Sequence, residues 1–373
     1  MNVRAAVLEE TGSPLAIREL ALDDPRANEV QVRLVATGVC HTDAAVRDGL
    51  IPTRSPVVLG HEGAGVVETV GEGVDHLQPG DHVVLSVNSC GTCRQCYSGH
   101  PSSCLRVNEY NFEGGRRDGT SAFAAEDGTT VGSHFFGQSS FAERVNASVR
   151  SVVKIPEDLP LDLAAPLGCG LQTGAGAVLN VLEPAPGGSL VVFGTGTVGL
   201  AAVMAAAARR LQTVIAVDVH AHRLELAAEL GATHTINGAE EDAVSRIREI
   251  TGDGVQTALD TTGNPHVFRQ MVDSLGPWGH AGLVGASPAD AEAVVDMPSA
   301  LSGGLKLSWI VEGDAVPQLF IPELIALHRA GDFPFDKLIK HYAFDEIAEA
   351  FADSASGDVL KPVLTFAEES AAA

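Results

Sequence analysis

The sequence predicts a combination of a β-rich N-terminal domain and an α/β domain built on a doubly wound parallel sheet. A length of 373 residues fits about two domains. Residues 1–150 contain short β-branched segments, frequent glycine and proline, and few helical patterns. From residue 170 onward, apolar strand patterns alternate with helical patterns, which is typical of a parallel sheet with helices on both faces.

The β-rich part is expected to form a barrel-like or sandwich module. Residues 31–35 alternate polar and apolar side chains, as a half-buried strand does. Two β-branched runs bounded by glycine or charge, 65–70 and 82–87, predict further strands.

The α/β part is expected to run from a buried strand at 189–193 to a last strand at 305–310. Between these two we predict strands at 213–217, 256–259 and 281–284, and helices at 200–211, 221–230 and 265–275.

The C-terminal tail changes pattern again. Residues 316–330 and 345–353 predict amphipathic helices, and 359–366 predict a final strand. Pro362 indicates the edge of a sheet, because proline has no N–H to donate to a neighbouring strand. Residues 371–373 are expected to be a frayed end.

The charge balance excludes several classes of partner. Lysine and arginine total 24 and aspartate and glutamate 48, so the formal net charge is −24. A nucleic-acid partner requires a basic surface, and an anionic membrane surface is disfavoured for the same reason. Glu9 and Glu10 follow the start too closely for a secretory leader, and no apolar run reaches the ~18–20 residues of a membrane span. We expect a cytoplasmic protein whose six cysteines serve metal binding or catalysis rather than disulfides.

Four of the cysteines form one compact motif with the spacing C-x2-C-x2-C-x7-C: Cys90, Cys93, Cys96 and Cys104. Tetrahedral Zn²⁺ takes four thiolates, and a site with all four positions filled is structural. An iron–sulfur cluster fits this spacing equally well. Because no second cysteine cluster follows, the sequence favours structural zinc.

The remaining cysteines, Cys40 and Cys169, lie on either side of His61 in the sequence. Two thiolates, one imidazole and an open fourth position describe a catalytic zinc site. Taken singly, each cysteine also fits a small buried apolar residue. Asp43 and Glu62 favour the metal interpretation, since a metal-bound histidine usually donates its other N–H to a carboxylate. Either acid also fits a solvated loop.

A glycine-rich loop, Gly194-Thr195-Gly196-Thr197-Val198-Gly199, follows a predicted strand and opens a predicted helix. In this context Gly194 permits a tight turn, Gly196 lets the backbone approach a pyrophosphate, and Gly199 lets the helix pack on the strand. The helix N-terminus then faces the phosphates. The loop predicts a dinucleotide-binding site, although a glycine turn needed only for packing would look the same.

The next strand pattern ends at Asp218. An acid at this position hydrogen-bonds the adenosine ribose and repels a 2′-phosphate, so it favours NAD over NADP. Arg223 fits either a contact to the ribose or an exposed helix arginine.

Taken together, these motifs resemble the zinc-containing alcohol dehydrogenases of the medium-chain dehydrogenase/reductase superfamily. The resemblance is carried, over nearly the whole length and in the family's order, by Gly60-His61-Glu62-x-x-Gly65 with Gly71 and Val74, by the four-cysteine motif, by Cys40, by Gly168-Cys169-Gly170 and by the nucleotide loop. It implies that Cys40, His61 and Cys169 bind a catalytic zinc.

The resemblance also implies the domain plan: a GroES-like catalytic domain over 1–170 with a structural zinc lobe at 90–104, an inserted NAD-binding Rossmann domain over 171–310, and a return to the catalytic domain over 311–373. It implies two zinc ions per chain, NAD, a small alcohol or aldehyde substrate, and a homodimer or homotetramer formed through the edge of the Rossmann sheet. Thr42 is expected to bind the alcohol hydroxyl, with Asp43 and Glu62 as acids behind the zinc.

Within the family, the chain is most similar to bacterial aryl-alcohol and allylic or monoterpene alcohol dehydrogenases. Segments 40–43, 135–141, 312–317, 320–322 and 333–336 carry this similarity. Phe135 and Phe136 are candidate walls of the substrate channel, with Ser86 and Ile51 beside them by family position, because aromatic walls suit flat apolar substrates. The two phenylalanines also fit ordinary core positions.

Three positions depart from the family pattern. Ala45 stands where many members carry a proton-relaying histidine. His41 replaces an arginine that contacts the pyrophosphate, and Lys361 replaces a C-terminal arginine near the phosphates. The resemblance therefore predicts cofactor contacts from His41 and Lys361 but an incomplete proton relay.

Two other functions remain open at this point. One is a thiol-dependent formaldehyde dehydrogenase of the same family. The other is a non-catalytic NAD sensor or partner-binding protein on the same scaffold; such proteins tend to lose zinc ligands, and all seven are present here.

Overall fold

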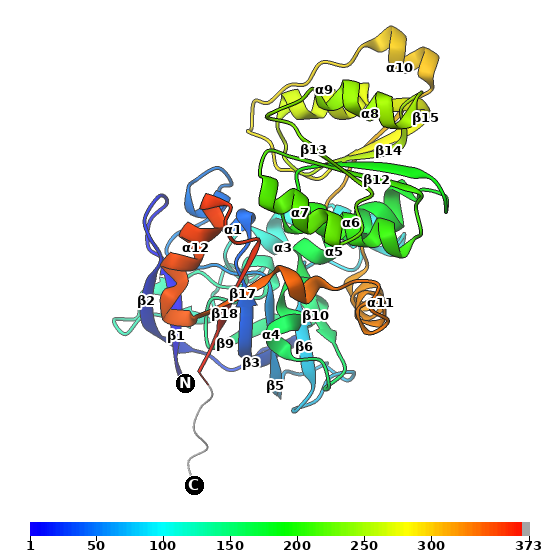
Figure 1. The fold of residues 1–373 in the computed structure, drawn as a ribbon. Coiled ribbons are helices and arrows are strands. Elements are labelled where there is room, and N and C mark those ends of the chain that lie inside the picture. Colours follow the sequence, from blue (N-terminus) through cyan, green and yellow to red (C-terminus); the bar gives the residue numbers. More distant parts are fainter. Residues whose placement is uncertain (368–373) are drawn as a thin grey trace. The chain divides into compact units, whose positions relative to one another are not determined.

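The computed structural model describes residues 1–367, and its chain forms two compact units (Figure 1). Unit 1 contains Met1–Cys169, Val316–Pro322 and the chain from Asp336 onward, and unit 2 contains Gly170–Ala315 and Glu323–Phe335. The expected return segment is thus shared between the units. Phe333 and Phe335 explain this division, because both rings are fully buried and they contact each other within unit 2. The expected frayed end at 371–373 lies outside the described residues.

Unit 1 is built on two sheets. The first has the strand order β4 (Val57–Val58), β1 (Asn2–Leu8), β2 (Ala16–Leu22), β7 (Phe123–Ala124) and β8 (Thr130–Val131). The second has the order β10 (Val152–Lys154), β6 (His82–Leu85), β5 (Gly63–Val70), β3 (Glu29–Gly38), β18 (Lys361–Thr365) and β17 (Ile339–Ala343), and β9 (Arg144–Ser148) also pairs with β3. Buried valine, leucine and phenylalanine side chains from both sheets form one core.

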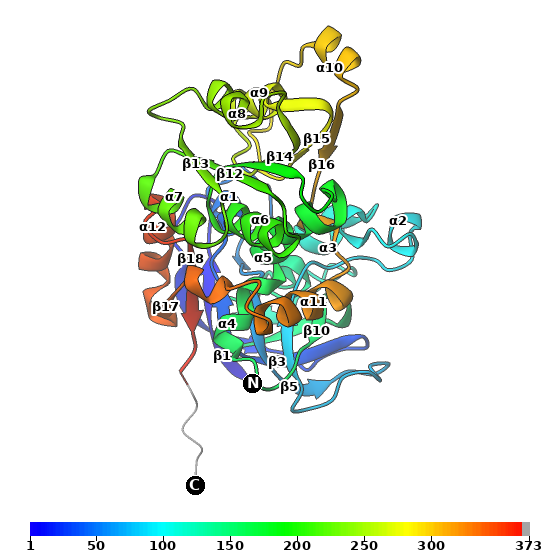
Figure 2. The ribbon, with the colours of Figure 1, turned by 45° about the vertical axis from the view of Figure 1, so that its right-hand side comes forward.

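Short helices connect these strands: α1 (His41–Arg47), α2 (Arg94–Tyr97), α3 (Val107–Asn111), α4 (Leu161–Ala164) and α12 (Ile347–Ser356). Helix α2 lies in the projecting lobe that carries the four-cysteine motif (Figure 2).

The pairing of β3 with β5 gathers distant parts of the sequence. The two strands are antiparallel, and Thr37 near the end of β3 pairs with Gly63 at the start of β5. Because Cys40 follows β3 and His61 precedes β5, this register places the two residues close together.

Pro362 does not mark an edge, so this expectation was wrong. Strand β18 lies between β3 and β17. Its antiparallel pairing with β3 begins only at Val363, opposite Gly38, so the missing N–H of Pro362 falls beyond the end of β3. The Pro362 carbonyl still accepts a hydrogen bond from the N–H of Val39.

Unit 2 is a six-stranded sheet in which all five pairings are parallel. The order is β13 (His234–Asn237), β12 (Thr213–Asp218), β11 (Ser189–Phe193), β14 (Val255–Asp260), β15 (Leu275–Leu283) and β16 (Lys306–Trp309). Helices α6 (Thr197–Ala208) and α7 (Ala221–Glu229) cover one face, and α8 (Ala243–Thr251) and α9 (Pro265–Asp273) the other (Figure 1). The doubly wound prediction is confirmed.

The other helices of this part of the chain are α5 (Gly170–Gly176), α10 (Met297–Gly303) and α11 (Pro317–Arg329), the last crossing the boundary between the units. Helix α6 begins three residues before the predicted position, because Gly196 is its N-cap and the end of the glycine loop forms its first turn. Within residues 1–367, no helix has the length and apolar character needed to cross a membrane.

Candidate metal centres and cofactor site

The structure brings together the three scattered ligands predicted for a catalytic metal. One ligand atom each from Cys40, His61, Glu62 and Cys169 lies within 4.8 Å of the others. The Sγ atoms of Cys40 and Cys169 are 4.0 Å apart. Cys40 is the N-cap of α1, and Cys169 follows a tight turn whose Gly168 carbonyl accepts a hydrogen bond from Ser86.

Asp43 holds two of these ligands. One carboxylate oxygen accepts hydrogen bonds from the His61 Nδ1 at 2.9 Å and the Gly60 N–H at 3.1 Å, and the other accepts the Cys40 N–H at 3.1 Å. Because the Asp43 carboxylate is an acceptor, it selects the tautomer with the proton on Nδ1, which leaves the lone pair on Nε2. This is the carboxylate–histidine arrangement that orients a metal ligand.

The His61 Nε2 tests whether a metal fits this site. It is fully buried and has no hydrogen-bond partner among the described residues, which is costly for a nitrogen without a ligand. Hydrogen bonding to Cys169, together with His61 and Lys361, lowers the pKa of the Cys40 thiol well below its usual value despite burial. Two sulfurs and an unpartnered imidazole nitrogen are the donor set of catalytic zinc, so the residues fit the ion.

Behind the ligands lies a buried ion pair. The Lys361 Nζ donates to both Glu62 carboxylate oxygens at 2.9 Å and to the Val39 carbonyl at 3.2 Å. Burial alone would lower the pKa of Lys361, but the Glu62 carboxylate and the Cys40 thiolate outweigh burial and raise it. The ammonium of Lys361 is thus held charged against Glu62.

The four-cysteine motif forms a second centre. Sulfur–sulfur distances are 3.5 Å for Cys93–Cys96, 3.9 Å for Cys90–Cys96 and 4.0 Å for Cys93–Cys104. Four sulfurs bound tetrahedrally at about 2.3 Å from one zinc ion would lie about 3.8 Å apart. These distances are far longer than a disulfide bond, so the motif fits a closed zinc site and all six cysteines carry free thiols.

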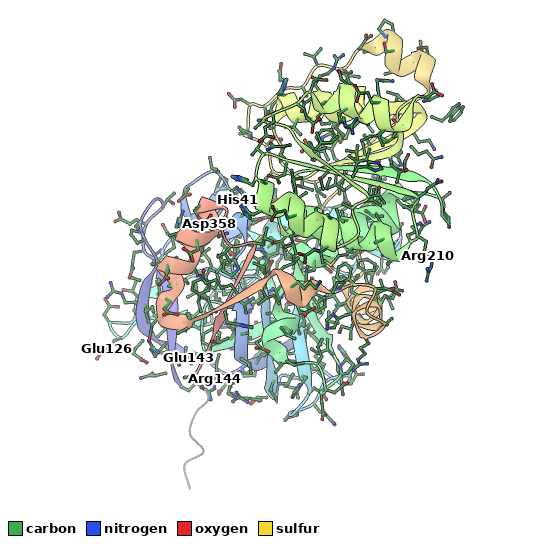
Figure 3. All side chains as sticks on the ribbon, in the orientation of Figure 1. His41, Glu126, Glu143, Arg144, Arg210 and Asp358 are labelled. Atoms are coloured by element: carbon green, nitrogen blue, oxygen red, sulfur yellow. The ribbon has the colours of Figure 1, made fainter. Side chains whose placement is uncertain are left out.

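Helix α1 carries the residues expected to meet substrate and cofactor. Thr42 lies in its first turn and is partly exposed, and His41, at its first position, is exposed (Figure 3). Ala45 is buried and has no group that could pass a proton.

The four predicted substrate-pocket residues all lie in unit 1. Phe136 stacks on the His61 ring, and Phe135 contacts the same ring edge-on. Ser86 is fully buried, and Ile51 packs against the core. Phe135 has no exposed surface and Phe136 is 6% exposed.

Gln138 is a residue whose role the sequence did not indicate. Its Oε1 accepts the Gly63 N–H at 3.1 Å, and its Nε2 donates to the carbonyls of His61 at 2.9 Å and Ser86 at 3.3 Å. It thereby ties the start of β5 to the end of β6. The sequence does contain one signal for this role: the polar run Gln138-Ser139-Ser140 lies between Phe136 and Phe141. Polar side chains flanked by aromatic residues are buried only where they hydrogen-bond to backbone groups.

Unit 2 contains a cavity of about 470 Å³ at the carboxyl ends of β11 and β12. Its lining includes Gly194, Gly196, Asp218 and Arg223. Gly194 has a φ of +86°, a conformation that favours glycine. A Cβ added to Gly196 would meet no atom within 4 Å, so the space beside Gly196 is open. A Cβ on Gly199 would overlap the Gly194 carbonyl oxygen. Thr197 and Val198 form the first turn of α6.

Asp218 closes one wall of this cavity. One oxygen accepts the Thr195 N–H at 2.6 Å and the Thr195 hydroxyl at 2.8 Å, and the other accepts the N–H groups of Val219 and His220. Burial would raise the pKa of Asp218, but these hydrogen bonds lower it. The carboxylate stays ionised, as repulsion of a 2′-phosphate requires.

Comparison with known proteins agrees with this arrangement. The family description "Alcohol dehydrogenase GroES-like domain" matches residues 26–157, and "Zinc-binding dehydrogenase" matches residues 197–327. A geraniol dehydrogenase from Castellaniella defragrans is 47% identical over 98% of both chains. The crystal structure of benzyl alcohol dehydrogenase from Acinetobacter calcoaceticus is 45% identical, with a TM-score of 0.96 over 98% of this chain and 100% of that one. An S-(hydroxymethyl)glutathione dehydrogenase from Saccharomyces cerevisiae is 36% identical over 96% of this chain and 95% of its own length.

The chain therefore belongs to the zinc-dependent alcohol dehydrogenases of the medium-chain dehydrogenase/reductase superfamily. It is an alcohol oxidoreductase that combines a GroES-like domain with a Rossmann-type domain, as the sequence predicted.

Proposed function

We propose that the protein transfers hydride reversibly between a primary allylic or aromatic alcohol and NAD, giving the aldehyde. The observation that carries this proposal is the set of three donors formed by half-buried Cys40, buried Cys169 and the unpartnered His61 Nε2. Because both Glu62 oxygens accept hydrogen bonds from Lys361, the three donors leave one coordination position for a substrate oxygen. The two relatives of highest identity above are named for geraniol and benzyl alcohol, which have the same CH₂OH group beside a double bond or ring.

Each residue has a defined part in this reaction. When bound by Cys40, His61 and Cys169, zinc would lower the pKa of an alcohol hydroxyl, and NAD would serve as the hydride acceptor. Asp43 keeps the proton of His61 on Nδ1, so that the imidazole binds through Nε2. Thr42 would accept the proton of the substrate hydroxyl while its own proton passes toward the nicotinamide ribose and solvent. Phe136 and Ile51 are assigned to the walls of the substrate channel, whereas Phe135 and Ser86 are fully buried and lie behind its surface.

Cofactor selection is assigned to unit 2, where Asp218 binds the ribose hydroxyls and Arg223 lies beside it, 4.0 Å from the carboxylate. His41, exposed at the start of α1, is assigned a weaker contact to the cofactor phosphates. The same contact predicted for Lys361 was wrong, because its ammonium is buried against Glu62 and the Val39 carbonyl. Replacement of Asp218 by alanine should relax the preference for NAD over NADP. Unchanged selectivity would remove this role from Asp218.

A substrate panel tests the proposal. With NAD, kcat/KM for benzyl or cinnamyl alcohol should exceed that for ethanol by about 100-fold, since each additional apolar contact in a pocket gives roughly 10-fold or more. Comparable values would contradict an aromatic or allylic preference. An arm with formaldehyde, with and without added glutathione, tests the thiol-dependent alternative: activity that requires the thiol would replace the present proposal.

We also infer that the chain forms a homo-oligomer, a dimer or tetramer, in the cytoplasm. Among residues 1–367, strand β16 pairs only with β15, so its other edge is open. The nearby Trp278, Leu301 and Trp309 are 77%, 85% and 68% exposed. An open edge with large exposed apolar side chains is typical of a surface covered by a second copy. Sedimentation analysis should show an oligomer that a Trp309→Lys change dissociates; a monomeric parent would contradict the inference.

A further inference from the structure

The segment between β8 and β9 has an unusual backbone. His134, Phe136 and Ser139 have φ values of 60°, 52° and 60°, and none of them is glycine. A left-handed conformation is rare for bulky residues, and clusters of it persist only where the surroundings impose them. We call residues 134–139 the left-handed turn.

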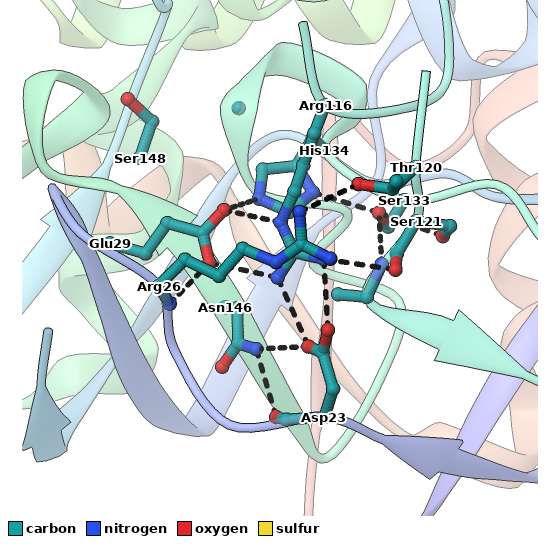
Figure 4. A network of polar contacts seen from close by, with 12 residues as sticks. Asp23, Arg26, Glu29, Arg116, Thr120, Ser121, Ser133, His134, Asn146 and Ser148 are labelled. Carbon is teal, nitrogen blue, oxygen red and sulfur yellow. Dashed lines mark hydrogen bonds and ion pairs between the residues drawn. The ribbon is translucent and has the colours of Figure 1, made fainter. Parts of the chain in front are cut away.

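A buried charged network holds the first residue of this turn (Figure 4). The His134 Nε2 lies 2.9 Å from a Glu29 carboxylate oxygen, and its Nδ1 lies 2.8 Å from the Ser133 hydroxyl. Arg116 binds the same carboxylate through two hydrogen bonds of 2.6 and 2.9 Å and also pairs with Asp23. Since His134 and Glu29 are each less than 10% exposed, this contact is shielded from water.

The end of the turn is fixed as well. The Ser139 hydroxyl donates to the Val58 carbonyl at 2.6 Å and accepts the Phe135 N–H at 3.0 Å. Gln138 donates to the carbonyl of His61 itself. The turn is thus anchored at both ends and has little freedom to move its aromatic side chains.

The turn places Phe136 on the zinc ligand. The rings of Phe136 and His61 are stacked, with centroids 4.5 Å apart and planes inclined by 26°. Phe112 meets Phe136 edge-on, with ring centroids 5.1 Å apart. The hydrogen bond that His61 donates to Asp43 fixes only one atom of the imidazole, so the ring could still tilt about that point. A flat ring against its face opposes this tilt.

We propose that Phe136 is a positioning residue for His61, and that the His134–Glu29 contact holds the left-handed turn in the conformation that keeps the two rings stacked. Phe136 then acts through the imidazole, by fixing the direction in which Nε2 meets the metal. The proposal rests on the assignment of His61 as a zinc ligand, and it goes beyond that assignment by adding a residue that touches no metal.

The test compares two aromatic replacements in the same cluster. Phe136→Leu removes the stack, whereas Phe112→Leu removes a neighbouring ring that does not contact His61. We expect Phe136→Leu to speed release of the catalytic zinc to a chelator about 10-fold, as loss of support around a metal ligand does. The zinc of the four-cysteine lobe serves as an internal control and should leave at an unchanged rate. The Co²⁺-substituted protein should show shifted visible absorption bands in Phe136→Leu alone.

Several outcomes would overturn the proposal. Parental zinc release and an unshifted Co²⁺ spectrum in Phe136→Leu would do so, as would equal changes in Phe112→Leu. His61→Ala tests the underlying assignment separately: retention of both zinc ions by that variant would contradict the metal site itself rather than the role of Phe136.

A second pair of variants addresses the turn and does not depend on the folding of Phe136→Leu. Asparagine tolerates a left-handed φ far better than alanine does. His134→Ala should therefore release the catalytic zinc faster than His134→Asn. Its Co²⁺ absorption bands should shift in the same way as those of Phe136→Leu. Parental release rates in both variants would show that the turn does not control the ligand.

Discussion

The two candidate metal centres of unit 1 are assembled in opposite ways. The four-cysteine lobe takes all of its ligands from one loop, between Cys90 and Cys104, and lies partly at the surface. The other centre takes Cys40, His61 and Cys169 from three distant parts of the chain, with the last two buried and Cys40 half-buried, and backs them with buried Asp43, Glu62 and Lys361. A closed site is held by its own four bonds to the ion. A site with an open position needs the surrounding protein to hold its ligands.

The largest difference between the centres should appear when one ligand of each is removed. Cys40→Ser should reduce kcat/KM by at least about 10³-fold and halve the zinc content, with little change in the unfolding temperature, because this metal serves chemistry. Cys93→Ser should do the reverse and cost more than about 4 kcal/mol of unfolding free energy while sparing the activity of the folded fraction. Metal analysis, kinetics and urea denaturation measure these effects. Similar losses of activity and of stability in the two variants would contradict the distinction between a catalytic and a structural metal centre.

Lys361→Met tests how far the site of Cys40, His61 and Cys169 depends on the buried ion pair between Lys361 and Glu62. The change leaves the Glu62 carboxylate buried without its partner, and such a loss costs about 3–5 kcal/mol. Urea denaturation should show this decrease in the free energy of unfolding. Adding Glu62→Gln should recover part of it, since the unpaired charge is then gone; a double variant less stable than Lys361→Met would refute this explanation.

Asp43→Asn should have a smaller effect on function. The amide retains the size of the carboxylate but cannot accept three hydrogen bonds as a charged group, so we expect a loss of roughly 10–100-fold in zinc affinity or activity. Asp48→Asn, at the exposed end of the same helix, is the matched control and should remain within about 2-fold of the parent. Zinc affinity is measured by competition with a chelator.

The smallest effect concerns acid stability near the left-handed turn. Burial would raise the pKa of Glu29, but Arg116 and His134 hold it far below its ordinary value of 4.5. This contribution to stability is present above about pH 4.5 and is lost as pH falls toward the lowered pKa. Glu29→Gln should therefore be less stable than the parent at pH 6, with a smaller gap near pH 3, in urea titrations. A difference in unfolding free energy between parent and variant that grows as the pH falls would contradict this explanation.

Local patterns were readable from the sequence, and contacts between distant segments were not. The glycine loop and the four cysteines each lie within one short segment, so their spacing alone indicated a turn and a ligand set. Residue type alone suggested Cys40, His61 and Cys169 as a ligand set but left other interpretations open, because the β3–β5 register that joins the first two is not visible in either strand alone. The family resemblance was needed to choose the metal site.

The errors have the same origin. Pro362 suggested an edge because strand composition does not reveal where the neighbouring strand ends. The support from His134 and Phe136 went unseen because left-handed backbone at non-glycine residues has no sequence signature.

The position of β18 has a consequence for biosynthesis. This strand lies inside the sheet of unit 1 and supplies Lys361 to Glu62, yet it is the last strand within residues 1–367. When the ribosome has produced residue 340, Cys40, His61 and Cys169 have all been made, but β18 has not. A chain that stops before β18 would thus leave residues 36–38 of β3 unpaired along one edge, and the Glu62 carboxylate without its counter-ion. The scaffold of the zinc site is therefore complete only after β18 has been made.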